Sequence, residues 1–123
     1  MYPDEFGRTW EGPYLFNTAS IASHAPRQFG VYQVLYREHA ALSVAYIGIA
    51  TGETIHGRLM KHCTGRGNWA LGRLGNPARF RFVYFCCDIV MARQIESNTV
   101  TLRKPPFNVR PEYGDFIPST AIH

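Results

Sequence analysis

The chain has 123 residues, of which 46% are hydrophobic and 18% are charged, and this composition is typical of one folded domain rather than of a disordered segment. No apolar run approaches the roughly 18 residues that a membrane span requires, and the N-terminus carries Asp4 and Glu5 instead of the apolar stretch of a signal peptide. We therefore expect a cytoplasmic protein with no membrane partner. The formal net charge of +4 favours a polyanionic partner such as DNA.

Residues 1–28 contain several aromatic residues among turn-forming prolines and glycines. We expect them to form an ordered N-terminal arm packed on the domain, with a short helix near residues 17–24. The stretch 30–36 (GVYQVLY) is rich in β-branched and aromatic residues and predicts a strand. Residues 37–42 are polar and predict a turn, while residues 44–49 (VAYIGI) predict a second strand, so that the two strands form a hairpin.

Thr54 is a suitable N-cap for a helix that runs through residues 55–62 and ends at Gly65. A glycine-rich loop follows at residues 64–77, and residues 80–86 (FRFVYFC) predict a third strand. Asp88 then caps a helix of about 14 residues that must stop before Pro105. The order β-β-α-β-α predicts a small α+β domain over residues 29–123, with a three-stranded, mainly antiparallel sheet flanked by helices and a short C-terminal tail.

The three cysteines, Cys63, Cys86 and Cys87, are odd in number and lack the spacing of a disulfide framework. Cys86 and Cys87 beside Asp88 raise the alternative of a zinc site. Adjacent side chains on a strand point to opposite faces, however, so ordinary thiols are the favoured interpretation.

The positive charges concentrate in the middle of the chain, where no Asp or Glu occurs between Glu53 and Asp88. The basic residues of this stretch are Arg58, Lys61, Arg66, Arg73, Arg79 and Arg81, and Trp69 lies among them. Two interpretations stay open: a surface that contacts phosphates, or an ordinary solvated basic face.

The last predicted helix carries an apolar stripe, and Glu96 lies beside it. The residues of the stripe are Ile89, Ala92, Ile95, Thr99 and Leu102. A carboxylate at the margin of a buried face needs a cation or hydrogen-bond donors. It could form a structural pair with an arginine such as Arg58, or it could be a ligand for a hard divalent metal ion.

Arg58 and His62 are four residues apart on one predicted helix and therefore project from the same face. An arginine can clamp a phosphate and a histidine can move a proton, although a surface arginine and a helix-terminal histidine are the commoner case. The two hairpin strands carry Tyr32 and Tyr46, which are residues that usually pack in a core with a solvated hydroxyl.

Taken in order, these residues resemble the GIY-YIG nuclease superfamily. The two name strings appear as Gly30-Val31-Tyr32 and Tyr46-Ile47-Gly48, and Arg58 and His62 follow at the spacing of the family. The twelve-residue step from Glu96 to Asn108, with two prolines just before the asparagine, is similar to the nuclease domain of the excision-repair protein UvrC. Ile49 departs from the pattern, because many members have a lysine there.

The resemblance implies an endonuclease that hydrolyses phosphodiester bonds in DNA. It implies that Glu96 holds one Mg²⁺ or Mn²⁺ ion and that Arg58 stabilises the transition state. Tyr32 is implied as the general base, helped by Tyr46 and His62, with the proton-accepting role left open among the three. Asn108 is implied to fix the loop near the carboxylate through side-chain amide bonds.

On this interpretation the DNA lies on Gly48, which lets the substrate approach the backbone, and on the basic stretch. The expected contact residues there are Lys61, Arg66, Trp69, Arg73 and Arg79. A double-strand cutter with one site per chain needs two chains or two encounters with the DNA, so a homodimer is one expectation. Two alternatives stay open: a non-catalytic nucleic-acid-binding module of the same fold, and a subunit that docks on a larger DNA-processing complex.

Overall fold

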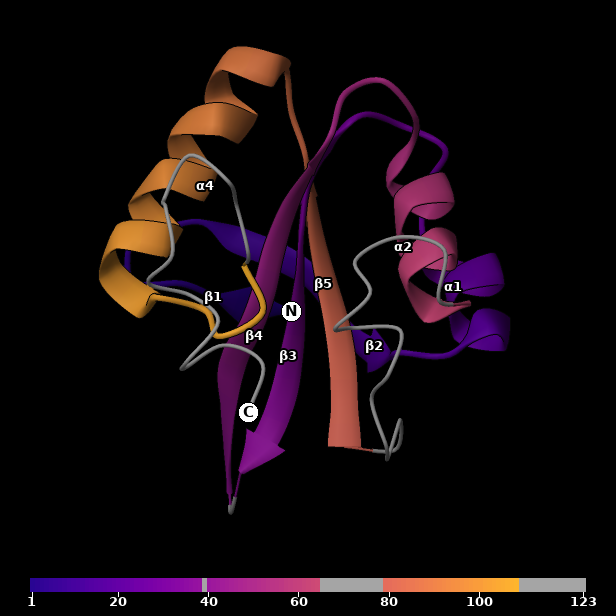
Figure 1. Cartoon of the computed structure of the whole chain (residues 1–123), viewed down its shortest axis with the longest axis horizontal. Helices are drawn as coiled ribbons and strands as arrows, with labels where there is room; N and C mark the ends of the chain where they lie inside the picture. Colours follow the sequence, from indigo (N-terminus) through magenta and orange to yellow (C-terminus); the bar gives the residue numbers. More distant parts are fainter. Residues whose placement is uncertain (39, 65–78, 109–123) are drawn as a thin grey trace.

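The computed structural model describes residues 1–38, 40–64 and 79–108, and these form one antiparallel sheet with helices on both faces (Figure 1). The elements in chain order are β1 (Tyr2–Pro3), β2 (Thr9–Leu15), α1 (Thr18–His24), β3 (Gly30–Glu38), β4 (Ala41–Ala50), α2 (Ile55–Cys63), β5 (Phe80–Cys86) and α4 (Ile89–Arg103). The predicted α+β class is confirmed.

Within the described residues the sheet has five strands in the order β1-β2-β5-β3-β4, so the prediction of three strands was wrong. The additional strands β1 and β2 come from the N-terminal arm, and β2 pairs antiparallel with β5. The sequence of β2, TWEGPYL, contains Gly12 and Pro13, which weaken a strand pattern. The sheet accommodates them through a register shift between Glu11 and Tyr14.

The predicted hairpin is confirmed, but its strands are longer than expected. Pairing runs from Gly30 opposite Ala50 to Glu38 opposite Ala41, so the predicted turn at residues 37–42 belongs largely to the strands. Polar side chains do not prevent this pairing, because a hairpin that projects into solvent needs no buried face at its end. A register shift after Val34 places one extra residue in β4 immediately before Tyr46.

Helices α1 and α2 cover one face of the sheet, and α4 covers the other (Figure 1). Alternate side chains of β3 therefore enter different cores: Tyr32 packs with the α1–α2 side and Val31 with the α4 side. Within the predicted stripe of α4, the middle residues are buried. Ile89 and Leu102 are instead 42% and 54% exposed, because they lie in the terminal turns of the helix.

The predicted helix starts are confirmed by their capping hydrogen bonds. The side chain of Thr54 accepts from the Gly57 amide at the start of α2, and Asp88 accepts from the Met91 amide at the start of α4. Helix α2 ends at Cys63, and the predicted end residue, Gly65, lies outside the described part of the chain. Helix α4 ends before Pro105, as predicted.

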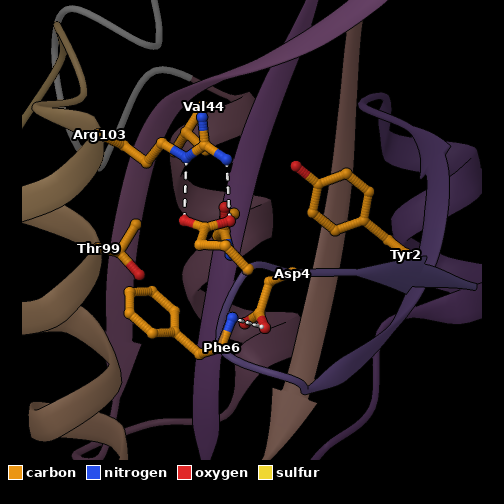
Figure 2. A pocket seen from close by; sticks show the side chains of 8 residues that line it. Tyr2, Asp4, Phe6, Val44, Thr99 and Arg103 are labelled. Atoms are coloured by element: carbon orange, nitrogen blue, oxygen red, sulfur yellow. Dashed lines mark hydrogen bonds and ion pairs between the residues drawn. The ribbon is translucent and has the colours of Figure 1, made fainter.

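An ion pair joins the N-terminal segment to α4, and Figure 2 shows it as dashed lines from Arg103. The guanidinium of Arg103 donates two hydrogen bonds to the carboxylate of Glu5, at 3.0 and 2.9 Å. Asp4 closes the adjacent turn by accepting from the Phe6 amide and from Trp10 Nε1. No helix within the described residues is both long and apolar enough to cross a membrane. Each of the three cysteines is a free thiol.

Candidate active site

A pocket of about 460 Å³ opens beside β4, which is the last strand of the sheet in the part of the chain that the structure describes. Side chains from α2 and α4, which cover opposite faces of the sheet, both reach this pocket. The lining residues are Tyr46, Ile49, Thr51, Arg58, Arg93 and Glu96. The pocket thus brings together three of the predicted catalytic residues, Tyr46, Arg58 and Glu96, from three separate elements.

Behind the pocket wall, Tyr32 and His62 form a buried pair. Their exposed fractions are 0% and 1%, and Tyr32 Oη lies 2.7 Å from His62 Nε2. Tyr46 lies beside both rings, with its centroid 6.2 Å from that of Tyr32 and 5.2 Å from that of His62. Tyr46 therefore separates the buried pair from the pocket.

Both members of this pair are neutral at physiological pH. Burial lowers the pKa of His62 to about 4, and the nearby charge of Arg58 acts in the same direction while Glu53 opposes it. Burial also raises the pKa of Tyr32, as does Tyr46, with Arg58 opposing. A protonated phenol and a neutral imidazole share this hydrogen bond, and the tautomer of His62 decides whether Tyr32 Oη or His62 Nε2 donates.

Gly48 makes room for Tyr32. The two residues are direct partners across the β3–β4 pairing, so the tyrosine of the first motif string lies against the glycine of the second. A Cβ atom at position 48 would meet Oη and Cζ of Tyr32 and would lie 2.9 Å from Tyr46 Cε2. This close packing requires a glycine, independently of the predicted approach of substrate to the Gly48 backbone, which stays a prediction.

Glu53 holds two of the basic residues of α2. Arg58 Nε lies 3.8 Å from Glu53 Oε1, and Lys61 Nζ lies 2.6 Å from Glu53 Oε2. Lys61 is exposed on the surface, whereas Arg58 is half-buried and reaches the pocket. The ion pair with Glu53 holds the Arg58 guanidinium in position and leaves it open to the pocket.

Asn108 closes the edge of β4 next to the pocket. Its side-chain oxygen accepts from the Ile47 amide at 2.9 Å, and its side-chain nitrogen donates to the Ile47 carbonyl at 2.8 Å. The neighbouring Phe107 amide donates to the carbonyl of Ala45. Asn108 is 3% exposed, so these are buried bonds to the strand that carries Tyr46.

Replacing Asn108 with Ala is expected to lower the free energy of unfolding by about 2–4 kcal/mol, because two buried backbone groups of Ile47 lose their partners. Urea denaturation measures the loss. Asn98→Ala, which makes the same change at a half-buried position of α4, is the matched control and is expected to change stability by less than about 1 kcal/mol. A loss as small as that of the control would show that the bonds to Ile47 contribute little.

The buried imidazole of His62 gives stability a pH dependence of defined sign. Its pKa in the folded protein, about 4, lies below the ordinary value of 6.5, so the unfolded chain binds the proton more readily. Stability should therefore be constant above pH 6.5 and should fall as the pH drops towards 4. Urea titrations at pH 6.5 and 4.5 should show that wild type loses about 2 kcal/mol more than His62→Gln, which keeps an acceptor for Tyr32. Equal losses in both proteins would contradict this assignment.

The predicted nucleic-acid contacts are only partly within the described chain. Arg79 lies exposed directly before β5, and Arg66, Trp69 and Arg73 fall outside the described residues. The sequence interpretation missed two charged residues, Glu53 and Arg93. Arg93 precedes Glu96 by three residues, and this helical spacing was a signal that could have placed both on one face.

The donor set of the pocket suits a hard divalent ion held by few protein ligands. Glu96 is 6% exposed and lines the pocket, and no cluster of three or more His, Cys, Asp or Glu side chains suited to a metal occurs in the parts of the chain that the structure describes. The described residues therefore contain no site in which several protein side chains surround a metal ion. Mg²⁺ is usually bound by one or two carboxylates together with waters and substrate oxygens, and a lone Glu96 fits that mode.

No protein-family model and no curated protein matches the sequence. Solved structures do match: the GIY-YIG N-terminal endonuclease domain of UvrC from Thermotoga maritima superimposes with a TM-score of 0.52 at 22–23% identity, over 73% of this chain and 96% of that domain. Two of these structures are point mutants described as bound to the catalytic divalent cation. The resemblance found in the sequence is thus confirmed in three dimensions, and the chain has the fold of a GIY-YIG endonuclease domain.

Proposed function

We propose that the protein is a metal-dependent endonuclease that hydrolyses phosphodiester bonds in DNA. The observation that carries the proposal is the pocket at the edge of β4, where Tyr46, Arg58 and Glu96 converge from a strand and two helices in front of the Tyr32–His62 pair. The similar solved domains are endonuclease domains bound to a catalytic divalent cation. A binding module would need cations in such a pocket but no buried carboxylate.

Glu96 would hold the metal ion, Mg²⁺ or Mn²⁺. The bound ion supplies Lewis-acid stabilisation of the charge that develops on the phosphate and on the leaving oxygen. Arg58, whose guanidinium reaches the same pocket, binds the non-bridging phosphate oxygens and stabilises them in the transition state.

The attacking water loses its proton to the buried pair by way of Tyr46. Tyr32 is fully buried, whereas Tyr46 lines the pocket and lies beside it. The water gives its proton to Tyr46 Oη, Tyr46 passes its own proton to Tyr32 Oη, and Tyr32 passes its proton to His62 Nε2. The hydroxide so formed attacks phosphorus, and the bond from phosphorus to the leaving oxygen breaks. The electron pair of that bond stays on the leaving oxygen, which takes a proton from solvent water in the pocket.

Substrate binding strengthens the base at the end of this relay. The charge of Arg58 contributes to the low pKa of His62 in the free protein. A phosphate bound to Arg58 offsets that charge and raises the basicity of the imidazole when substrate is present. The site thus keeps His62 neutral in the free protein and makes it a better proton acceptor in the complex.

Incubation of the protein with single-stranded, duplex and branched DNA tests the proposal, with Mg²⁺, with Mn²⁺ and with EDTA. We expect cleavage with either metal and none with EDTA, and the preferred DNA form identifies the substrate class. Binding without cleavage under every condition would reject the nuclease and leave a nucleic-acid-binding module of the same fold.

A further inference from the structure

The second arginine of the pocket, Arg93, has no role in the chemistry described above. It lines the pocket from α4, three residues before Glu96 and therefore on the same side of the helix. Glu96 is buried, whereas Arg93 is exposed. The carboxylate thus lies inside the pocket and the guanidinium lies at its rim.

Arg93 carries a positive charge that the described protein does not neutralise. The ion pairs of the described residues join Arg58 and Lys61 to Glu53, and Arg103 to Glu5, and none of them includes Arg93. Ile49, which lines the same pocket, adds no charge on the strand side. The guanidinium of Arg93 is therefore available to bind an anionic ligand at the rim of the pocket.

We propose that Arg93 is a substrate-positioning residue that binds the phosphate next to the scissile one, on the same DNA strand. The inference rests on the proposed function, in which Arg58 holds the scissile phosphate. Arg58 and Arg93 face one pocket from helices on opposite faces of the sheet, and consecutive phosphates of a strand offer anionic groups at both walls. Contact between Arg93 and this phosphate at the rim of the pocket fixes which phosphate of the DNA strand lies over Glu96. Arg93 itself does not touch the reacting atoms.

Steady-state cleavage by Arg93→Gln tests this assignment. We expect KM to rise about tenfold and kcat to change by less than about threefold, because a phosphate contact away from the reacting atoms contributes to binding. The salt dependence of binding should fall by roughly 0.7–0.9 in log–log slope, the contribution of one phosphate contact. Arg37→Gln is the matched control, since Arg37 is exposed at the other end of the β3–β4 hairpin and away from the pocket. A fall in kcat at unchanged KM, or kinetics equal to those of the control, would overturn the proposal.

Oligonucleotides with a single neutral methylphosphonate locate the contact. At one phosphate adjacent to the cleavage position, the neutral linkage should weaken binding by wild type and by Arg37→Gln but not by Arg93→Gln. Binding measured in EDTA needs no cleavage and therefore tests the contact separately from the proposed function. If neither Mg²⁺ nor Mn²⁺ supports cleavage, the nuclease proposal fails, while moving the methylphosphonate along the oligonucleotide still shows whether binding to one phosphate depends on Arg93. Equal weakening in all three proteins at every adjacent phosphate would reject the contact.

Discussion

Glu96→Gln is expected to reduce cleavage at least a thousandfold while DNA binding stays within about threefold of wild type. The change removes the negative charge of the buried pocket carboxylate and preserves its size. Loss of the metal ion would remove about 4 kcal/mol of transition-state stabilisation, which corresponds to about three orders of magnitude in rate. Cleavage of the preferred DNA form with Mg²⁺ measures the effect.

Two further measurements make this result specific for metal binding. Titration with Mn²⁺ should show a binding event in wild type that is absent from Glu96→Gln. Glu11→Gln, which makes the same change at an exposed position of β2, should retain both cleavage and metal binding. A Glu96→Gln protein that cleaves as fast as this control would remove the carboxylate from the reaction.

Tyr32→Phe is expected to lower kcat about a hundredfold to a thousandfold, with little change in DNA affinity. The substitution deletes only the hydroxyl that lies 2.7 Å from His62 Nε2 and therefore interrupts the relay to the imidazole. The fully buried ring stays in place against Gly48, so the fold should be kept. Single-turnover cleavage at saturating enzyme separates this loss in kcat from binding.

Tyr36→Phe is the matched control for this experiment. Tyr36 lies on the same strand, opposite Ser43, at the end of the hairpin that is remote from the pocket. It should cleave at the wild-type rate. If Tyr32→Phe is as active as Tyr36→Phe, then Tyr32 transfers no proton and Tyr46 must pass the proton elsewhere.

The core of the fold could be predicted because its signals are local. The strands β3, β4 and β5 have uniform β-branched and aromatic patterns, and the capping residues Thr54 and Asp88 stand where their helices begin. The strand β2 was missed because Gly12 and Pro13 interrupt its pattern, and only pairing with β5 makes it a strand. Pairing with β5 thus makes Thr9–Leu15 a strand, although the local sequence alone does not predict one.

The residues of the candidate site were predicted from the sequence, but which of them are buried and which face the pocket was not. Motif spacing identified Tyr32 and Tyr46 equally, whereas only the packing around β4 makes the first fully buried and the second part of the pocket wall. Arg93 was missed for a related reason. Its proximity to Arg58 depends on β4 being the outermost strand, and strand order is not a local property of the sequence.

The hydrogen bonds of Asn108 have a consequence for association between molecules. An outermost strand displays amide and carbonyl groups that can pair with a strand of another chain, and such pairing is a common route to aggregation. In β4, the side chain of Asn108 engages both outward groups of Ile47, and the Phe107 amide engages the carbonyl of Ala45. The contact that holds the strand of Tyr46 in place therefore also shields it from intermolecular pairing. The position of this pocket residue and the resistance of the strand edge to association depend on the same few bonds.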